Sequence, residues 1–161
     1  MIICGIDPGF AITGFGIIEI INGSPHLIDY GTIQTSSKTP FSKRLLLLSE
    51  GLSEIITKYS PESIAVEELF FNNNAKTALA VAHARGVILL TAEKLSKNIY
   101  SYTPLQIKTA VTGYGLAHKK QVQYMVCRLL NLKKTPKPDD AADALASAIC
   151  HSQLYKIKSL G

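Results

Sequence analysis

Apolar residues occur along the chain in short continuous runs and in longer runs with helical spacing. Residues 2–6 and 63–66 form two short runs rich in β-branched residues, each with a proline close by. Such runs are typical of strands that are buried on both faces. A carboxylate follows each run directly, Asp7 after the first and Glu67 after the second. The pattern therefore predicts two buried strands that both end in an acidic residue.

The chain between these two strands predicts their relative direction. Residues 14–21 and 26–33 have strand character, and the Asn22-Gly23 pair between them favours a hairpin turn. Residues 40–59 carry leucine and isoleucine at helical spacing, which predicts a crossover helix back to the same edge of the sheet. The second acidic strand should then run parallel to the first. If the two are neighbours, their carboxylates share a crevice at the carboxyl end of the sheet, where open α/β sheets bind ligands.

Two more acids lie on the last predicted helix. Pro138 fits its first turn, and Asp139 and Asp140 suit its amino terminus as caps and as partners of the helix dipole. Asp140 and Asp143 are three residues apart, so they project from one helix face within about 60° of each other. Five alanines follow Asp140 within this helix and leave little side-chain bulk. The helix can therefore lie close to a sheet, which would bring its acids within reach of Asp7.

Each acid also has a purely structural interpretation. Asp139 is better explained as a cap than as a ligand, and Asp140 fits either role equally. Asp143 lies beyond the first turn, where aspartate has poor helix propensity and caps nothing, so solvent exposure is its only alternative. Asp7 and Glu67 are also compatible with partly exposed strand ends. A shared divalent-metal site accounts for Asp7, Glu67, Asp140 and Asp143 together.

The residue types indicate which metal such a site would bind. Oxygen ligands without histidine or cysteine at fixed spacing favour Mg²⁺ or Mn²⁺ over zinc. Several carboxylates close together repel one another, which raises the pKa of at least one of them and destabilises the fold until a cation binds. We therefore expect Mg²⁺ as cofactor, with Mn²⁺ as a substitute. We also expect Mg²⁺ to raise the melting temperature and Asp7→Asn to weaken that response.

Composition favours one soluble domain over residues 1–161. The chain is 47% hydrophobic with a mean hydropathy of +0.16, which is enough apolar surface for a single core. No apolar stretch approaches the length of a membrane span, and the amino terminus lacks a secretory pattern. These features predict a cytoplasmic protein with no membrane partner. The three cysteines lie in apolar segments without metal-type spacing, which indicates reduced core thiols.

Charge divides the chain into two unequal parts. Residues 1–93 hold six basic and nine acidic side chains, a net charge of −3, whereas residues 94–161 hold eleven and three, a net charge of +8. A single lysine is most simply explained as solvated surface. A basic region around a carboxylate site has a further use, because it can hold a phosphodiester while metal ions neutralise the acids beneath it. The charge distribution therefore predicts a nucleic-acid substrate.

Five sequence motifs in a fixed order resemble one known family over nearly the whole chain. They are Gly5-Ile6-Asp7-Pro8-Gly9 with Thr13-Gly14-Phe15-Gly16, Ala65-Val66-Glu67-Glu68-Leu69-Phe70, Ala84-Arg85-Gly86-Val87, Lys119-x-Gln121-Val122 with Met125-Val126, and Asp140-Ala141-Ala142-Asp143-Ala144-Leu145-Ala146. Any one of these motifs alone would be weak evidence of a relationship. Together they closely resemble the RuvC family of Holliday-junction resolvases.

This resemblance implies a ribonuclease H-like α/β fold, with a five-stranded mixed sheet flanked by helices. It also implies an Mg²⁺-dependent endonuclease that resolves four-way DNA junctions by paired symmetric nicks during recombination and repair. Asp7, Glu67, Asp140 and Asp143 would be the catalytic acids that bind two Mg²⁺ ions. The enzyme would be a homodimer with two identical sites, and it would work with the RuvA–RuvB branch-migration complex.

The resemblance carries further residues over with less support from the chain itself. Lys108 and Lys119 match basic residues that the family places near the DNA backbone, and Lys120 adjoins them. Phe70 matches an aromatic that stacks on an unpaired base at the junction centre, although core packing also explains it. The predicted helix over residues 75–95 has a stripe of small residues that the resemblance assigns to the dimer interface. Packing against its own sheet would give the same pattern.

Two other enzyme classes remain open from the residues alone. The turn at Asp7 and Gly9, with Gly14, also resembles the phosphate-binding turn of sugar kinases and heat-shock-type ATPases. Those enzymes close two such domains on ATP, whereas this chain has room for one, so tight ATP binding would identify them. A YqgF-type RNA-processing nuclease would instead prefer RNA. A structural DNA-binding protein has no use for clustered acids, and metal-dependent cleavage separates that case.

Overall fold

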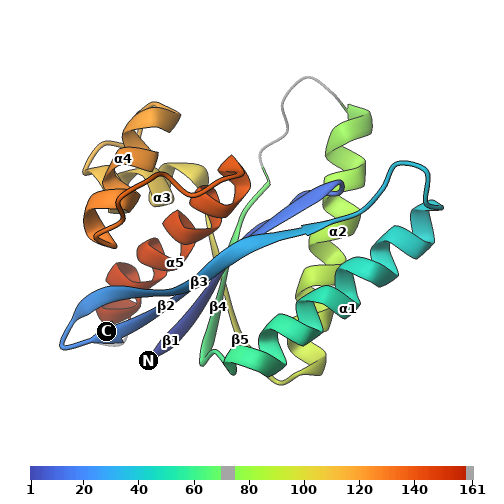
Figure 1. The fold of residues 1–161 in the computed structure, drawn as a ribbon, viewed down its shortest axis with the longest axis horizontal. Helices are drawn as coiled ribbons and strands as arrows, with labels where there is room; N and C mark the ends of the chain where they lie inside the picture. Colours follow the sequence, from blue (N-terminus) through green and yellow to red (C-terminus); the bar gives the residue numbers. More distant parts are fainter. Residues whose placement is uncertain (70–74, 159–161) are drawn as a thin grey trace.

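The computed structural model describes residues 1–69 and 75–158. Phe70, the aromatic expected to stack on a base, lies outside the described residues. Within them, ten elements follow one another along the chain (Figure 1). They are β1 (Ile2–Asp7), β2 (Ile12–Ile21), β3 (Ser24–Gln34), α1 (Phe41–Tyr59), β4 (Ser63–Glu67), α2 (Ala75–Lys94), β5 (Asn98–Tyr102), α3 (Pro104–Thr112), α4 (Lys119–Leu129) and α5 (Asp139–Lys158).

The strands form one mixed sheet in the order β3-β2-β1-β4-β5. β2 pairs antiparallel with β1 and β3, whereas β4 pairs parallel with β1 and β5. The predicted five-stranded mixed sheet is confirmed, and so is the adjacency of β1 and β4. The carboxyl ends of the two strands that carry Asp7 and Glu67 therefore meet at one edge.

The β2–β3 hairpin is tighter than the sequence suggested. Asn22 and Gly23 form the turn alone, with positive φ values of 50° and 82°, as a two-residue turn of this kind requires. β3 therefore begins at Ser24, two residues before the predicted start, and contains Pro25. β3 is an edge strand, so a proline without an N–H removes no bond from the interior of the sheet.

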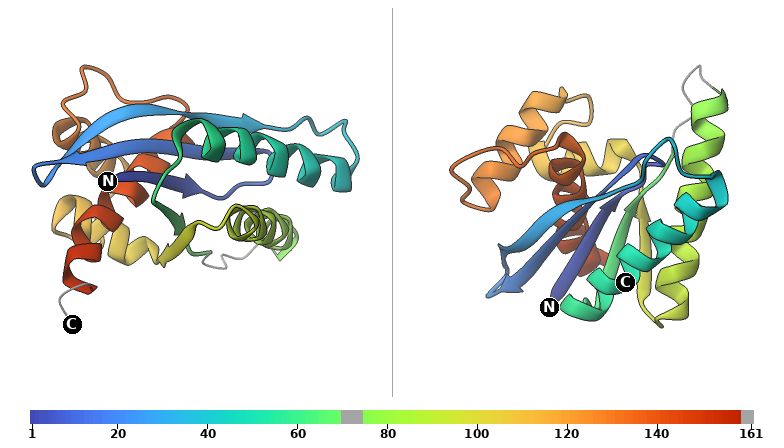
Figure 2. Two further views of the ribbon diagram at one scale, coloured as in Figure 1. Left: turned by 90° about the horizontal axis from the view of Figure 1, so that it is seen from below. Right: turned by 45° about the vertical axis from the view of Figure 1, so that its right-hand side comes forward.

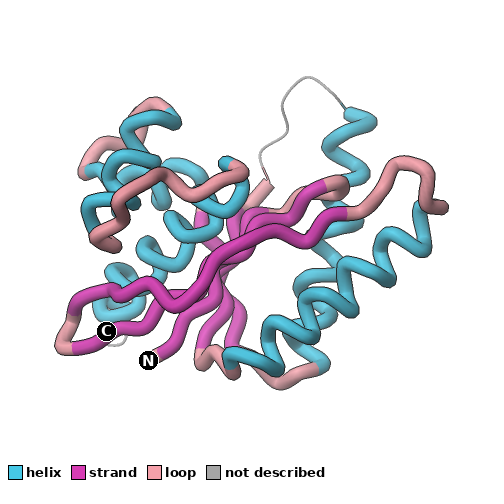
Figure 3. Tube along the Cα trace, in the orientation of Figure 1, coloured by secondary structure: helices cyan, strands magenta, loops and turns pink. Residues whose placement is uncertain are grey.

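Helices cover both faces of the sheet, as Figures 1 and 2 show, and Figure 3 shows the sheet as the central layer. α1 and α2 pack on one face, and α3, α4 and α5 lie on the other. Two apolar clusters fill the spaces between these layers. Ile3 and Ala65 belong to the cluster beneath α5, whereas Ile6 and Val66 belong to the cluster beneath α1 and α2.

Strand alternation decides on which face the two strand-end acids lie. Successive side chains of a strand point to opposite faces of the sheet. Asp7 follows Ile3 at even spacing and therefore faces α5. Glu67 follows Ala65 by two residues and faces α5 as well. Both strand-end carboxylates thus face the helix that carries Asp140 and Asp143.

α5 lies very close to the sheet because both surfaces are made of small residues. A Cβ atom built on Gly5 would lie 2.0 Å from the carbonyl oxygen of Ala144, and one built on Gly14 would lie 2.0 Å from the carbonyl oxygen of Asp140. Only glycine leaves room for such an approach. The close packing expected from the alanines of α5 is confirmed. The matching glycines in β1 and β2 were the part that the hydrophobic pattern did not identify.

The region between β4 and α5 contains elements that the hydrophobic pattern did not assign, namely β5, α3 and α4. α3 starts with a capping box, in which the Thr103 hydroxyl accepts from the Gln106 backbone N–H and the Gln106 side chain accepts from the Thr103 N–H. Pro104 occupies its first turn. This local pattern was available in the sequence and would have located the start of the helix.

The cysteine environments and the helix lengths agree with the predictions of core thiols and of no membrane-spanning stretch. Cys4 and Cys150 are buried and Cys127 is half-buried, and among the described residues these three cysteines are thiols that form no disulfide with one another. Within the described residues, every helix is too short or too polar to cross a bilayer.

Candidate metal and nucleic-acid site

The structure brings all four predicted acids to the carboxyl edge of β1 and β4. Asp7 is the register partner of Gly14 on β2, and the backbone carbonyl of Asp140 packs directly over Gly14. Glu67 ends β4, the parallel neighbour of β1. The charges of Glu67, Asp143 and Asp140 all act on the Asp7 carboxyl. Residues far apart in the sequence therefore share one electrostatic environment.

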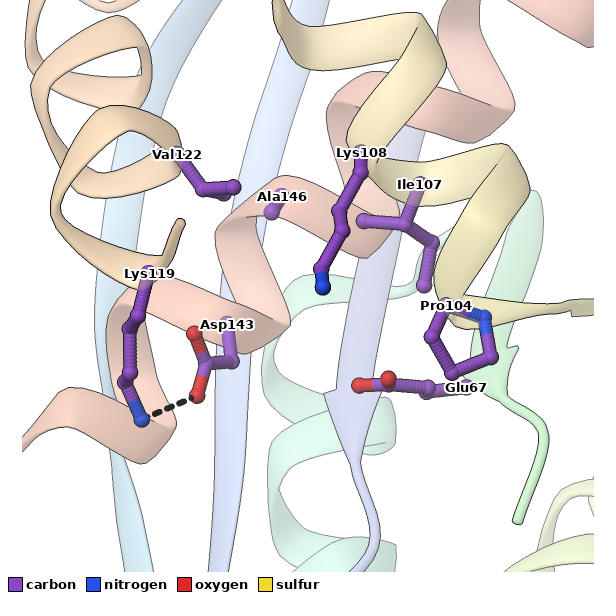
Figure 4. A pocket seen from close by; sticks show the side chains of 8 residues that line it. All are labelled: Glu67, Pro104, Ile107, Lys108, Lys119, Val122, Asp143 and Ala146. Carbon is purple, nitrogen blue, oxygen red and sulfur yellow. Dashed lines mark hydrogen bonds and ion pairs between the residues drawn. The ribbon is translucent and has the colours of Figure 1, made fainter. Parts of the chain in front are cut away.

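A cleft of about 290 Å³ opens beside these acids. Glu67 and Asp143 line it together with Lys108 and Lys119, and Figure 4 shows the Lys108 ammonium pointing into the space between the two carboxylates. Lys119 donates to Asp143 at 2.9 Å. An apolar wall is formed by Pro104, Ile107, Val122 and Ala146. The cleft thus combines clustered acids with two cations at its mouth.

Burial and mutual repulsion raise the pKa values of three acids at this site, Asp7, Glu67 and Asp143. Desolvation and then the charges of Glu67, Asp143 and Asp140 raise the pKa of Asp7 to about 8. Desolvation, with the charge of Asp143, raises the pKa of Glu67 to about 7, although Lys108 and Lys119 act in the opposite direction. Desolvation also raises the pKa of Asp143. Without a cation, these groups resist being charged together.

Lys119 is the cation most closely tied to the acids. Burial lowers its pKa, but the hydrogen bond to Asp143 and the charges of Asp143, Asp139 and Asp7 outweigh this and raise it. The Lys119 ammonium therefore stays charged and partly neutralises the cluster. Its side chain is about half exposed, so it can also contact a ligand in the cleft.

Asp139 lies at the edge of the site and has other partners. Its carboxylate accepts from Lys137 at 2.8 Å and lies 3.6 Å from the Lys119 ammonium. The Lys137 hydrogen bond lowers the pKa of Asp139. As the first residue of α5, it also interacts favourably with the helix dipole. Asp139 is therefore accounted for by these structural contacts.

The donor set fits a hard divalent cation, although the side chains do not surround one in this conformation. Among the described residues, no group of three or more histidine, cysteine, aspartate or glutamate side chains is close enough to hold a metal ion. The acids interact through charge, and Lys119 binds one of them. Their oxygen-only chemistry suits Mg²⁺ or Mn²⁺. A bound cation would also relieve the repulsion that raises the pKa of Asp7.

The remaining predicted DNA contacts separate into two locations. Lys108 and Lys119 line the cleft. Lys120 is exposed and lines different cavities, on the outer side of α4. Successive residues of a helix turn by about 100°, so Lys119 and Lys120 leave α4 in different directions, and Lys120 is not among the residues that line the cleft. Lys120 therefore does not belong to the carboxylate cleft.

Comparison with known proteins places this chain in a family. Residues 3–151 match the family model described as "Crossover junction endodeoxyribonuclease RuvC". A relative of that name from Desulforamulus reducens is 57% identical over 153 residues, covering 95% of this chain and 94% of the relative. One from Alkaliphilus metalliredigens is 54% identical over 160 residues, covering 99% of this chain and 98% of the relative.

Solved structures agree with this match. Thermus thermophilus RuvC in complex with a Holliday junction substrate aligns with a TM-score of 0.93 at 33% identity, covering 99% of this chain and 97% of that one. A yeast mitochondrial Holliday junction resolvase aligns with a TM-score of 0.71 at 15% identity, covering 98% of this chain and 83% of that one, and supports the ribonuclease H-like fold alone. The chain therefore belongs to the RuvC family of crossover junction endodeoxyribonucleases.

Proposed function

We propose that this chain is a metal-dependent endonuclease that resolves four-way DNA junctions, with Asp7, Glu67, Asp140 and Asp143 as its metal-binding acids. One observation carries the proposal. The carboxyl ends of β1 and β4 and the start of α5 gather acids whose pKa values are raised, next to lysines at the mouth of the same cleft. An arrangement of this kind suits phosphodiester hydrolysis better than any metal-free chemistry.

The cofactor assigned to the site is a pair of Mg²⁺ ions, for which Mn²⁺ can substitute. Bound divalent cations would supply the activation of water and the stabilisation of the leaving oxygen. Asp7 faces α5 and is acted on by the charges of the other three acids, so it would be a central ligand of the bound cations. Glu67 and Asp143 would bind cations on the side of the site that faces the cleft. Asp140 would bind them on the side that faces β2.

Two lysines are assigned to positioning the substrate. Lys108 projects between Glu67 and Asp143 (Figure 4), where an ammonium can hold a non-bridging phosphate oxygen. Lys119 now pairs with Asp143 at 2.9 Å, and would exchange part of this contact for the phosphate when the acids are neutralised. Both groups act as fixed positive charges at the place where negative charge develops during hydrolysis.

The homodimer is assigned to the outer stripe of α2. Leu79 and Leu90 on this helix are 60% and 55% exposed, and a Cβ added at Gly86 would meet nothing within 4 Å. Leucines exposed on one stripe of a helix, around a glycine, fit a two-fold interface with a second copy. Two identical sites would then nick two strands symmetrically. We also assign residues 1–161 to a single domain. From the family, we assign the RuvA–RuvB complex as a partner.

The proposal is tested by cleavage of defined DNA substrates. Wild type and Asp7→Asn are incubated with a labelled four-way junction and with a matched linear duplex, each with Mg²⁺ or EDTA. We expect paired symmetric nicks on the junction alone, abolished by EDTA and by Asp7→Asn. Lys94→Gln is the matched control, because it removes a charge from the far end of α2 and should cut normally.

Other outcomes would lead to other assignments. Junction binding without metal-dependent cutting would leave a DNA-binding role. Preferred cleavage of RNA would indicate a YqgF-type nuclease, and tight ATP binding without DNA binding would indicate the ATPase class. Each of these outcomes contradicts the resolvase assignment.

A further inference from the structure

The outer side of α4 carries a basic groove that the carboxylate cleft does not use. Its volume is about 640 Å³, and the residues that line it include no acid. We define the α4 groove by five of its lining residues: Lys120, Tyr124, Arg128, Lys133 and Lys134. Lys120, Tyr124 and Arg128 come from the helix, and the two remaining lysines come from the chain after it.

The four cations of this groove have no acidic partner within the part of the chain that the structure describes. The ion pairs found there involve other cations, such as Lys119 and Lys137. All four groove cations are exposed. Four like charges lining one cavity repel one another, and this cost is relieved when a polyanion occupies it. The α4 groove therefore has the charge of a polyanion site.

Its geometry matches a nucleic-acid backbone. Lys120, Tyr124 and Arg128 are spaced by four residues, so they form one stripe about 12 Å long on α4. One strand of a duplex rises by about 3.4 Å per phosphate along the duplex axis. Successive phosphates lie farther apart along the winding backbone, so the stripe spans fewer than about four of them, and each of its two cations can reach one. Tyr124 is 63% exposed between the two cations, where its ring can pack on a sugar and its hydroxyl can bond a phosphate.

The groove also adjoins the cleavage site. Lys119, which contacts Asp143 in the cleft, is directly followed in the chain by Lys120, which lines the groove. A DNA strand that leaves the cleft past the start of α4 would therefore meet Lys120, at the near end of the groove, next. An acidic protein segment would match the charge as well, but it would give no reason for this continuity.

We propose that the α4 groove binds the sugar-phosphate backbone of a junction arm and anchors the substrate away from the point of cleavage. The proposal rests on the assigned function and adds to it a contact surface outside the catalytic cleft. Arg128, Lys133 and Lys134 should therefore contribute to junction affinity and its salt dependence. They should not contribute to the rate of cleavage of bound DNA.

The test compares two double variants with the same loss of charge. Arg128→Ala/Lys133→Ala removes two groove cations, whereas Lys94→Ala/Lys97→Ala removes two cations next to the amino end of β5, at the opposite edge of the sheet. Junction binding is measured without divalent metal over a range of salt concentrations. The groove variant should flatten the plot of log affinity against log salt by about two phosphate contacts, roughly 0.9 each. The control should follow wild type.

Single-turnover cleavage at saturating enzyme completes the test. The groove variant should cut bound junction in Mg²⁺ at the wild-type rate and at the same nucleotides. Unchanged binding by the groove variant would overturn the proposal and favour an acidic protein as occupant. A failure of wild type to bind or cut junctions would instead contradict the assigned function, so the two failures are distinguishable.

A separate observation concerns Arg85, which bridges the ends of two strands from α2. Its Nε donates to the Glu67 backbone carbonyl at 3.4 Å, and its Nη2 donates to the Ser101 Oγ at 2.9 Å. Neither neighbouring strand offers a free backbone N–H to the Glu67 carbonyl. β1 is followed by Pro8, which has no N–H, and the N–H of Thr103 after β5 donates to Gln106. Arg85 therefore satisfies a carbonyl that the sheet leaves open.

We infer that Arg85 is a positioning residue that fixes the end of β4 and thereby the Glu67 carboxylate. Arg85 acts through the Glu67 backbone, because its charge is not among the causes of the pKa shift of the Glu67 side chain. Ligands of a metal site must be held within about 0.5 Å of their working positions. Loss of the bridge should therefore impair metal use more than DNA binding. This inference also rests on the assigned function.

The test separates metal use from DNA affinity. For Arg85→Gln we expect the Mg²⁺ concentration at half-maximal cleavage to rise about tenfold, as for other residues that support metal ligands, with partial rescue by Arg85→Lys. Junction affinity measured with EDTA should be unchanged, and the Mg²⁺-dependent rise in melting temperature should shrink without DNA present. Lys94→Gln on the same helix should behave as wild type. Weaker junction binding with unchanged Mg²⁺ dependence would make Arg85 a DNA contact and overturn the inference.

Discussion

α2 and α5 are both alanine-rich helices of 20 residues, but they bury their small residues differently. The five alanines of α5 between residues 141 and 148 are at most 1% exposed, and two of the sheet glycines lie directly against its backbone. α2 buries Ala84 and Ala92 against the sheet, but its stripe through Leu79, Gly86 and Leu90 is exposed. Small residues therefore mark close approach in one helix and an open surface in the other.

The difference follows from what faces each helix. α5 lies over glycines of β1 and β2, so its own sheet uses the space that its alanines leave. Apart from the neighbouring turns of α2 itself, no described residue lies within 4 Å of a Cβ placed on Gly86, so the equivalent stripe of α2 is available to a second copy. The α5 contact positions the acids that we propose to be catalytic, and the α2 stripe would position the second site. Substitutions can therefore disturb the contact of α5 with the sheet or the contact of the α2 stripe with a second copy.

Gly14→Ala should have the largest effect, because it separates α5 from the sheet. The added methyl would lie 2.0 Å from the Asp140 carbonyl oxygen, which belongs to the backbone and cannot move aside alone. We expect a loss of about 3 kcal/mol in the free energy of unfolding, together with loss of junction cleavage. Urea unfolding and cleavage assays measure the two effects. A variant with wild-type stability would contradict the close packing of α5.

Leu90→Glu should break the other contact and leave the fold intact. Leu90 is 55% exposed, so a charge there costs little in the isolated chain but a great deal in an apolar two-fold interface. We expect the dimer dissociation constant to rise at least a hundredfold, which corresponds to about 2.7 kcal/mol. Analytical ultracentrifugation measures this change, and paired nicks should become single nicks. Lys120→Glu, an exposed position on α4 across the sheet from α2, is the control and should remain dimeric.

Asp7→Asn should remove part of the pH dependence of the metal-free protein. The pKa of Asp7 is about 8 in the folded protein against 3.8 in its ordinary state. The folded protein therefore holds this proton more tightly, so its stability falls as the pH rises from about 4 to about 8. In EDTA at pH 9, the variant should exceed wild type by ~2 kcal/mol in urea unfolding. With Mg²⁺, wild type should be the more stable of the two proteins instead. If the variant were the more stable protein with Mg²⁺ as well as with EDTA, the proposed metal site would be contradicted.

Gly86→Ala should give the smallest effect and the opposite sign to Gly14→Ala. Its methyl meets nothing within 4 Å, and alanine in a helix interior is more stable than glycine by about 1 kcal/mol. Measured in the monomeric Leu90→Glu background, the variant should unfold at a higher urea concentration. If Gly86→Ala destabilised the monomer, the Gly86 face of α2 would be packed against its own chain and would not be an open surface.

The sequence was sufficient for the parts of the fold that depend on local pattern. Apolar runs located β1 and β4, and proline and alanine positions located α5. The four acids followed because each lies at an element boundary or on one helix face. β5, α3 and α4 were not assigned from pattern. β5 has no continuous apolar run, because Asn98 and Ser101 interrupt it, and α3 and α4 have only 9 and 11 residues, which carry little helical periodicity. The capping box at Thr103 was the usable indication of α3.

The rest of the site depends on contacts between distant residues. Lys119 and Asp143 are 24 positions apart and meet only because α4 packs beside α5. The different directions of Lys119 and Lys120 require the rotation of α4 about its axis, which residue order does not give. The Arg85 bridge to the end of β4 likewise requires the position of α2. Charge composition predicted a polyanion substrate but could not separate the cleft from the α4 groove.

Anomalous diffraction from Mn²⁺-soaked crystals would locate the metal and test whether acids from β1, β4 and α5 form one metal site. We expect Mn²⁺ peaks within about 2.0–2.4 Å of carboxylate oxygens of Asp7 and at least two of the other three acids, and we expect Asp7→Asn to abolish them. Peaks elsewhere, or a wild-type enzyme that cuts junctions in Mn²⁺ with no peak at Asp7, would contradict this site.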